Sequence, residues 1–277
     1  MGVQQNHSFL GEPSQTVRAI KGPGGRLILK VAIAWILFLA MAGFKTYPLI
    51  RHFTTHIPSD LGDPLLNAWI LAWDFHALST DPCNLFNANI LYPLKNTLAL
   101  SEHLMGVLPI FAPAYAMTGN PVIAYNIMLF LSFPLCGIAM FLLVYYWTQN
   151  FWAALISGVL FAFAPARFGQ LYHVQLLNLY WTPIALLFLE RFLRTRSWGI
   201  LLGFAICYWM QVLACVYLGW FATIAIVMYM LYYIIIINND HHNRLIVIRS
   251  LIFVILSIIT LLPLHFPYYE VKQRWGV

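Results

Sequence analysis

The chain has 277 residues, of which 61% are hydrophobic and 9% are charged. Soluble domains carry about 45–50% apolar and about 25% charged residues, so this composition excludes a soluble fold. The formal net charge of +6 does not indicate a nucleic-acid partner, because the basic residues lie mostly in short clusters beside apolar runs, where they set membrane orientation.

The apolar runs predict an all-α, polytopic transmembrane bundle, because they approach ~20 residues instead of alternating over the ~10 residues of a barrel strand. Residues 1–26 are polar and basic and predict a cytoplasmic tail before a transmembrane domain at 27–277. The first run covers 27–44. The small residues of Ala40-Met41-Ala42 leave a cleaved signal peptide as the alternative. Later runs cover 122–147, 151–165, 174–189, 198–217, 218–237 and 250–267.

The segment 45–121 is predicted to be a large external loop. It holds five of the nine acidic residues, namely Asp60, Asp63, Asp74, Asp81 and Glu102. Within it, Pro64–Ser79 is predicted as a helix with Asp63 as its N-cap, lying in the membrane interface on its tryptophans. A second apolar stretch, Ser101–Thr118, is predicted as a helix whose position in or across the membrane sets the topology.

Basic clusters decide that topology. Two arginine groups lie between later runs: Arg191, Arg194 and Arg196, then Arg244 and Arg249. If Ser101–Thr118 crossed the membrane, both groups would be external, against the preference of Lys and Arg for cytoplasmic loops. We therefore predict about seven spans, with the N-terminus inside, the C-terminus outside and two interfacial helices in the first loop. The connection 165–175 and the end 263–277 then share the external side with that loop.

Asp60 and Asp63 are the first candidates for chemistry. A partly desolvated carboxylate at the membrane face suits a general base acting on a hydroxyl. The alternative is structural: Asp63 caps its helix and Asp60 is a solvated loop residue. Both roles remain compatible, with Asp63 as the preferred base and Asp60 as its substitute.

Glu102 and His103 form a second polar pair at the start of the second loop helix. Together with Asp60 or Asp63, their side chains suit a divalent cation, although the sequence does not fix a metal site. His52 and His56 are spaced to share a helical face, but two histidines without a third ligand predict a structural or solvated role more strongly than a metal.

Arg167 follows the external end of a span and precedes Gln170, His173, Gln175 and Asn178. A polar cluster at the membrane border marks a functional site unless its charges reach lipid headgroups. Arginine suits phosphate through its forked donors, and Lys95 is the only other cation between Arg51 and Arg191.

Several short motifs in order resemble one protein family. They are Gly62-Asp63-Pro64-Leu65-Leu66-Asn67-Ala68-Trp69, Asn89-Ile90-Leu91-Tyr92-Pro93, Thr97-Leu98-Ala99, Ser101-Glu102-His103, Gly119-Asn120-Pro121, Ala124-Tyr125-Asn126 and Ala164-Pro165-Ala166-Arg167 through His173-Val174-Gln175. Together, over about residues 30–270, they resemble bacterial GT-C-type integral membrane glycosyltransferases, similar to the protein O-mannosyltransferases and the lipid A aminoarabinose transferase.

The resemblance implies transfer of a sugar from a polyprenyl-phosphate donor to a lipid, glycan or protein acceptor at the external face of a bacterial inner membrane. It implies Asp63 or Asp60 as the catalytic acid residue, and Asn67, Glu102, His103, Arg167, His173 and Gln175 as substrate-binding residues. The Asp-Glu pair of the O-mannosyltransferases is missing, because Leu or Pro follows each aspartate. Family members also usually have more spans, so we expect an N-terminal portion or a truncated member.

Two other function classes stay open. A flippase-like carrier would place charges near helix midpoints, whereas these apolar runs are nearly free of charge. A non-catalytic membrane scaffold would need no polar cluster at one membrane face.

Overall fold

The computed structural model describes residues 24–233, 235 and 241–276, and these contain helices and no strands. An all-α fold is therefore confirmed over the described ranges. Most of the predicted tail at 1–26 lies outside them. Candidate membrane spans, by length and apolar composition, cover Gly25–Lys45, Pro121–Thr148, Phe151–Phe168 and Val174–Thr195. They indicate an integral membrane protein.

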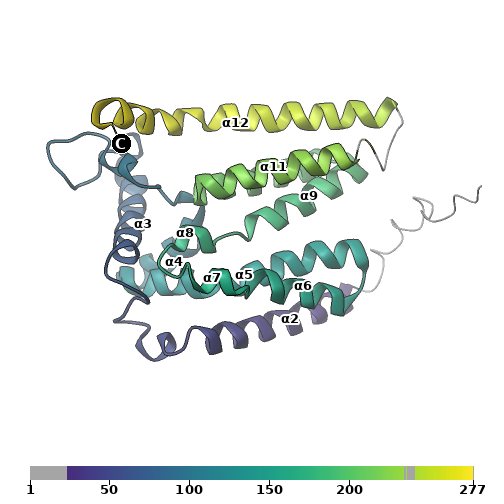
Figure 1. Ribbon diagram of the computed structural model, residues 1–277, viewed down its shortest axis with the longest axis horizontal. Helices are drawn as coiled ribbons and strands as arrows, with labels where there is room; N and C mark the ends of the chain where they lie inside the picture. Colours follow the sequence, from purple (N-terminus) through teal and green to yellow (C-terminus); the bar gives the residue numbers. More distant parts are fainter. Residues whose placement is uncertain (1–23, 234, 236–240, 277) are drawn as a thin grey trace, which may run out of the picture.

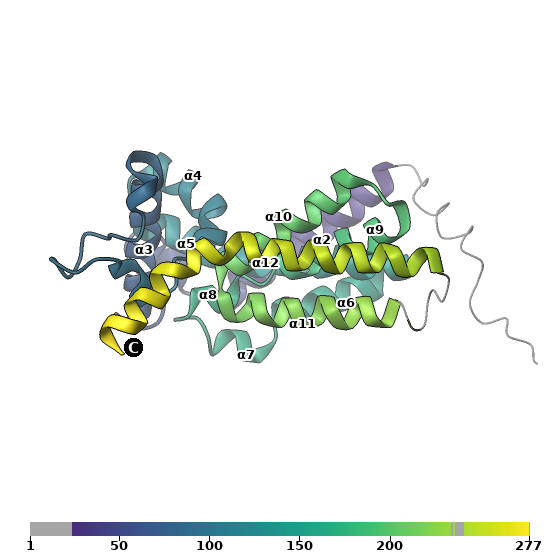
Figure 2. The same cartoon turned by 90° about the horizontal axis from the view of Figure 1, so that it is seen from above.

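The long helices lie side by side and run back and forth along one axis (Figures 1 and 2). In chain order they are α2 (Gly24–Lys45), α5 (Pro121–Thr148), α6 (Phe151–Ala162), α9 (Trp181–Thr195), α10 (Trp198–Ala214), α11 (Val216–Tyr232) and α12 (His241–Trp275). The turns are tight because asparagines cap the helices that follow them. Asn120 and Asn150 each accept two backbone N–H bonds, at the starts of α5 and α6.

Small residues let α2, α5 and α6 approach closely. The buried ring of Phe38 on α2 fills the space beside Gly137 of α5 and Gly158 of α6. A Cβ on either glycine would lie 2.6 Å from that ring. Close packing against small residues holds helices together where lipid removes the hydrophobic drive for association.

One end of the bundle carries the predicted first loop (Figure 1). Its elements are η2 (Leu49–His52), α3 (Asp63–Thr80), η3 (Pro82–Asn84), η4 (Thr97–Leu100), η5 (Met105–Val107) and α4 (Leu108–Thr118). The axis of α3 lies across the ends of the long helices. The short helices α7 (Pro165–Phe168) and α8 (Val174–Leu177) and the C-terminal end of α12 lie at this same end. Asn96 donates to Glu270 at 2.7 Å and ties the loop to α12.

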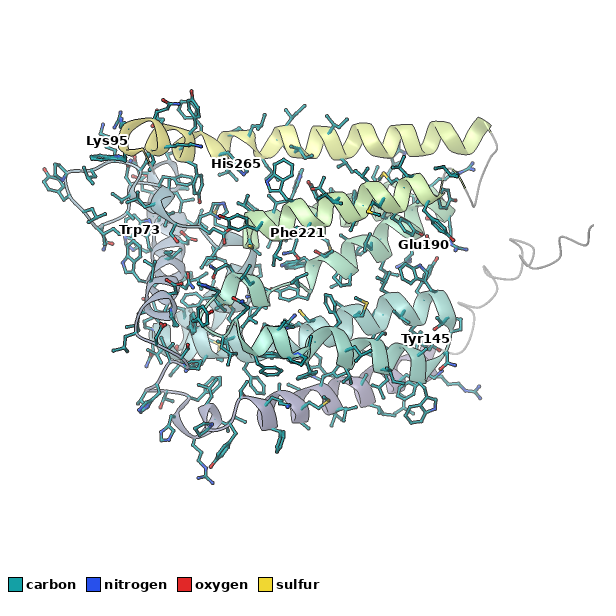
Figure 3. The ribbon with its side chains drawn as sticks, in the orientation of Figure 1. Trp73, Lys95, Tyr145, Glu190, Phe221 and His265 are labelled. Atoms are coloured by element: carbon teal, nitrogen blue, oxygen red, sulfur yellow. The ribbon has the colours of Figure 1, made fainter. Side chains whose placement is uncertain are left out.

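The opposite end holds the turns after α5 and α9. Lys30 donates to the Tyr145 hydroxyl at 2.9 Å there, and buried Glu190 pairs with Arg194 and with the Tyr229 hydroxyl. Figure 3 shows Tyr145 and Glu190 far from Trp73 and Lys95, which mark the end with the loop. Lys30 and Arg194 therefore lie at the end away from α3, whereas Lys45 and Lys95 lie at the end that carries α3.

The second predicted loop helix is shorter than expected. Residues 101–104 are not helical, and α4 has 11 residues. At 1.5 Å per residue its length is about 16 Å, too short to cross a bilayer core of about 30 Å. It packs on α3 and α5, with Phe75 of α3 edge-on to Tyr115 at 5.5 Å.

Candidate functional site

Four of the polar residues singled out from the sequence meet at the end of the bundle that carries α3. Asp63, in the first turn of α3, has its Oδ2 atom 2.9 Å from Nδ1 of His173, which immediately precedes α8. One turn along α3, Asn67 donates to Gln175 at 3.3 Å. The Asp63 and His173 side chains keep 48% and 31% of their surface exposed, so a substrate can reach the pair.

The predicted cap at the start of α3 is wrong. The helix begins at Asp63 and its N-cap is Gly62, which makes no side-chain capping bond. The Asp63 carboxylate instead contacts His173. Asp60 supports the turn before the helix, because its Oδ1 accepts the Gly62 N–H at 3.0 Å.

Tyr125 of α5 lies behind these carboxylates. It is fully buried and interacts electrostatically with Asp63 and Asp60. Its hydroxyl has no hydrogen-bond partner among the described residues. Because this hydroxyl is itself buried, it belongs to the interior behind the site and is not exposed to a substrate. The Ala124-Tyr125-Asn126 motif was the only sequence signal for it.

Glu102 has a structural contact instead of a place beside Asp63. Its Oε1 accepts the Val216 N–H at 2.9 Å, at the first residue of α11. A carboxylate at a helix N-terminus accepts a hydrogen bond from an N–H that has no partner within the helix, and its negative charge interacts favourably with the helix dipole. Burial raises the pKa of Glu102, against the lowering effect of the Val216 hydrogen bond.

His103 is also a packing residue. It is 4% exposed, and its Nδ1 accepts the Met105 N–H at 3.3 Å. The rings of Phe86 and Tyr268 lie 6.3 Å from its ring. Burial, and then the charge of His265, lower its pKa to about 4. Neutral His103 therefore belongs to the contact between the loop and α12.

Asp74, one of the five acidic residues of the first loop, is a buried carboxyl on α3. It is 0% exposed on α3, and neither carboxyl oxygen has a hydrogen-bond partner among the described residues. Burial raises its pKa to about 8. It is therefore neutral below that pH, which avoids the large cost of burying an unpaired charge.

The guanidinium of Arg167 points into the bundle. The residue is buried, and Arg167 donates to the Leu177 carbonyl at 2.7 Å and to the Cys136 sulfur at 3.2 Å. The Phe133 ring lies 5.3 Å from the guanidinium carbon. These contacts join α7 to α5 and α8, and they occupy two of the Arg167 nitrogens that were expected to bind a phosphate.

No three His, Cys, Asp or Glu side chains among the described residues are grouped to hold a metal ion. The cation site left open by the sequence would have needed Glu102 or His103 beside Asp60 or Asp63. Those two pairs make the separate contacts given above, so the described residues do not form that ligand set.

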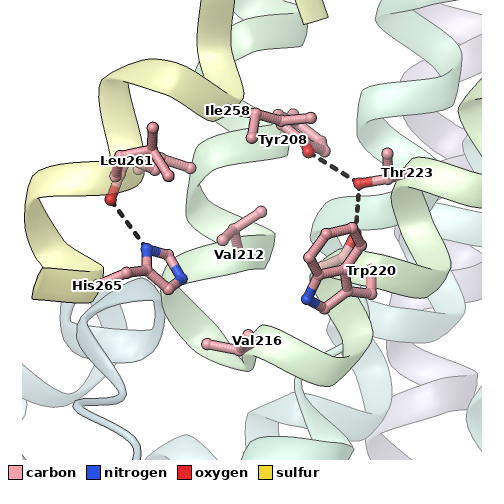
Figure 4. Close-up of a pocket in the computed structure, with 10 residues that line it drawn as sticks. Tyr208, Val212, Val216, Trp220, Thr223, Ile258, Leu261 and His265 are labelled. Atoms are coloured by element: carbon pink, nitrogen blue, oxygen red, sulfur yellow. Dashed lines mark hydrogen bonds between the residues drawn. The ribbon is translucent and has the colours of Figure 1, made fainter. Parts of the chain in front are cut away.

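Two pockets accompany these residues. An apolar one of about 230 Å³ lies between α10, α11 and α12, and its polar side chains bond locally (Figure 4). The Tyr208 hydroxyl contacts Thr223 at 2.8 Å, and His265 contacts the Leu261 carbonyl at 2.9 Å. The other pocket, about 310 Å³, lies at the end of α2 beside Ser59 and Leu171, near the Asp63 and His173 pair in sequence.

Comparison of the chain with protein-family models, curated proteins and solved structures finds no match. Arguments about function therefore rest on the residues and their geometry.

Proposed function

We propose that the protein is a membrane glycosyltransferase that moves a sugar from a polyprenyl-phosphate donor to an acceptor hydroxyl. The observation that carries the proposal is the accessible Asp63 and His173 pair at 2.9 Å, where α3 meets the segment before α8. A carboxylate in contact with an imidazole can act as a general base, and its position at the bundle end suits a substrate that is half lipid and half sugar.

The chemistry follows from that pair. Asp63 takes the proton of the acceptor hydroxyl as its oxygen attacks the anomeric carbon. The bond from that carbon to the phosphate oxygen breaks, and its electron pair leaves with the lipid phosphate. Attack from the face opposite the phosphate inverts the anomeric centre through an oxocarbenium-like transition state. His173 orients the carboxylate. Asn67 and Gln175 lie one helical turn away, where amide groups can bind sugar hydroxyls.

The proposed topology has seven spans: α2, α5, the segment Phe151–Phe168 that includes α6, the segment Val174–Thr195 that includes α9, and α10, α11 and α12. The helices α10 and α11 have 17 residues each, the lower end of the length range of about 17–25 for spans. The end with Arg194 is assigned to the cytoplasm, because the cluster Arg191, Arg194 and Arg196 is expected to lie inside, and the end with α3 is external. Membrane lipids surround the bundle, and the acceptor approaches from outside.

Cysteine labelling tests this topology. Cys83 is exposed and the other three cysteines are buried, so Cys83→Ser supplies a background that keeps the core intact. Asp81→Cys and Tyr172→Cys should react with an impermeant thiol reagent in intact cells, whereas Thr195→Cys should react only after permeabilisation. External labelling at 195 would contradict the orientation.

The activity test uses the purified full chain in lipid nanodiscs, a panel of polyprenyl-phosphate sugars, a lipid, a glycan and a peptide as acceptors, and detection of released polyprenyl phosphate. Removing a general base lowers rates by ~10²–10⁴-fold, so Asp63→Asn should lose that much. Asp81→Asn is the matched control, because Asp81 is an exposed first-loop carboxylate bonded only to its neighbour Asn84. Wild-type turnover by Asp63→Asn would refute the assignment, and loss in Asp60→Asn alone would transfer the role to Asp60. Wild-type protein that releases no polyprenyl phosphate from any sugar of the panel would count against transfer and favour a carrier or scaffold.

A further inference from the structure

The pocket at the end of α2 is lined on one side by cationic and imidazole side chains. Lys45, the last residue of α2, and the histidines of the next turns, His52 and His56, share its wall with Ser59. Among the described residues, no aspartate or glutamate lines it. The rest of the wall is formed by Thr46 and by apolar residues: Tyr47, Pro48, Leu49, Ile57, Pro58, Leu129 and Leu171.

The ammonium of Lys45 is not neutralised by a carboxylate among the described residues. Its recorded contact is with the face of Phe168, 5.7 Å from the ring centre. A Lys ammonium has three donors and no acceptor, so this contact leaves its hydrogen-bonding capacity unused. The neighbouring acid, Asp60, directs Oδ1 to the Gly62 N–H.

The two histidines add donors at fixed positions. Their ring centres lie 4.8 Å apart, and Nδ1 of His56 contacts the Thr55 hydroxyl at 2.8 Å, which leaves the opposite nitrogen of that ring available. The segment itself is held by α5, because the Asn126 amide donates to the carbonyls of Phe53 and His56 at 2.8 and 2.7 Å. The donors are therefore positioned before any ligand arrives.

The mouth of the pocket lies at the level where a membrane surface is expected. Lys45 ends a candidate membrane span, and large apolar side chains around it face outward. Phe44 is 79% exposed and Tyr47 58% exposed, with Ile50 beside them. The guanidinium carbon of Arg51 lies 5.2 Å from the centre of the Tyr47 ring. Cations and aromatic rings in contact are typical of the membrane interface. A ligand entering here meets both apolar side chains and the Lys45 ammonium.

We infer that this pocket binds the phosphate group of an anionic lipid, with Lys45 as the charge partner and His52 and His56 as further donors. Its wall includes Ser59 and Leu171, which lie next to Asp60 and two residues before His173, so the phosphate would be held beside the Asp63 and His173 pair. The identification of this lipid as the sugar donor rests on the proposed function. The binding of a lipid phosphate in this pocket is independent of the proposed function.

The test measures binding without any sugar. Detergent-purified full chain is titrated with undecaprenyl phosphate, dioleoyl phosphatidic acid, dioleoyl phosphatidylcholine and inorganic phosphate, and binding is followed by native mass spectrometry. The two anionic lipids should bind, and phosphatidylcholine should bind at least ~10-fold more weakly, because charged hydrogen bonds are worth a factor of ~10–10². Inorganic phosphate that binds as tightly as the lipids would overturn the lipid assignment.

Substitutions test which residues of the pocket bind the lipid phosphate. Lys45→Gln should weaken binding of both anionic lipids by ~10-fold or more, and Lys45→Arg should restore it. Lys95→Gln, in the same loop but outside this pocket, is the matched control. His56→Gln should weaken binding as well, and gives a second readout if Lys45→Gln does not fold. Unchanged affinity in Lys45→Gln and His56→Gln would refute the site.

The proposed function can be refuted without refuting this lipid-phosphate site. Asp63→Asn should bind both lipids at least as tightly as the wild type, because it removes a negative charge beside the proposed phosphate position and Asp63 acts on the acceptor. A protein that binds lipid phosphate through Lys45 but transfers no sugar would refute the transferase and leave this site standing.

Discussion

Gly106 gives a sharp test of how the first loop docks on the bundle. A Cβ at this position would lie 2.0 Å from the Met210 carbonyl oxygen and 2.3 Å from the Ala214 nitrogen, both backbone atoms of α10. Because neither atom can rotate away, Gly106→Ala must separate the loop from α10 by about 1 Å or more to reach ordinary contact. The same shift strains the hydrogen bond from Trp181 Nε1 to the Gly106 carbonyl, now 3.0 Å long.

The magnitude follows from those two effects. Overpacking costs about 1–3 kcal/mol and a lost hydrogen bond about 1 kcal/mol. At about 2–4 °C per kcal/mol for a chain of this size, the apparent melting temperature should fall by ~5–15 °C.

The assay is thermal unfolding of the purified full chain in one detergent, followed by tryptophan fluorescence at one scan rate. Gly199→Ala is the control, because Gly199 lies in the first turn of α10 and a Cβ there has no atom within 4 Å. Alanine is favoured over glycine in helices, so this variant should melt at or above the wild-type temperature. A Gly106→Ala protein that melts with the control would show that the loop is not packed on α10 as described.

Three further outcomes are expected from the same assay. Burial raises the pKa of Asp74 to about 8, whereas an unfolded carboxyl ionises near pH 4. The residue therefore lowers the stability of the folded state progressively as the pH rises between those values. Asp74→Asn should melt ~5–15 °C above the wild type at pH 8 and at the wild-type temperature at pH 4. Arg167→Met should lower the melting temperature, because the Leu177 carbonyl loses its partner, while binding of lipid phosphate persists; the reverse pattern would restore Arg167 as a phosphate ligand. Asp63→Asn and His173→Gln should each leave the melting temperature within ~2 °C, since exposed pairs contribute only about 0–1 kcal/mol; a large drop would indicate a structural pair.

The long helices were predictable because membrane spans need continuous apolar runs, and their ends carry local signals. The run at 122–147 corresponds to α5, Pro121–Thr148, and Asn120 before Pro121 marks its start. The broken stretch at 198–237 was predicted as two helices with a boundary at 217. The structure places that boundary at Cys215, where the backbone is extended between α10 and α11.

The failures come from contacts between distant segments. Ser101–Thr118 looks continuous by composition, yet Glu102 reaches Val216, 114 positions away, and Leu104 adopts a positive φ of 52°. Both features keep residues 101–104 out of the helix, and neither can be recognised from the neighbouring sequence. The inward turn of Arg167 has the same origin, since the Leu177 carbonyl and the Phe133 ring come from other helices.

The position of Arg167 changes which cation can serve the proposed chemistry. A leaving phosphate needs a positive charge whose donors are free when the substrate arrives. Two Arg167 nitrogens already bond Leu177 and Cys136, and recruiting them would leave a buried carbonyl unsatisfied. Lys45 is exposed at the end of α2, in a pocket whose wall includes Leu171, two residues before His173. Lys45 would bind the lipid phosphate and Asp63 would activate the acceptor, so the two functions are assigned to different side chains. For this reason, exchanging Lys45 and exchanging Asp63 should separate donor binding from turnover.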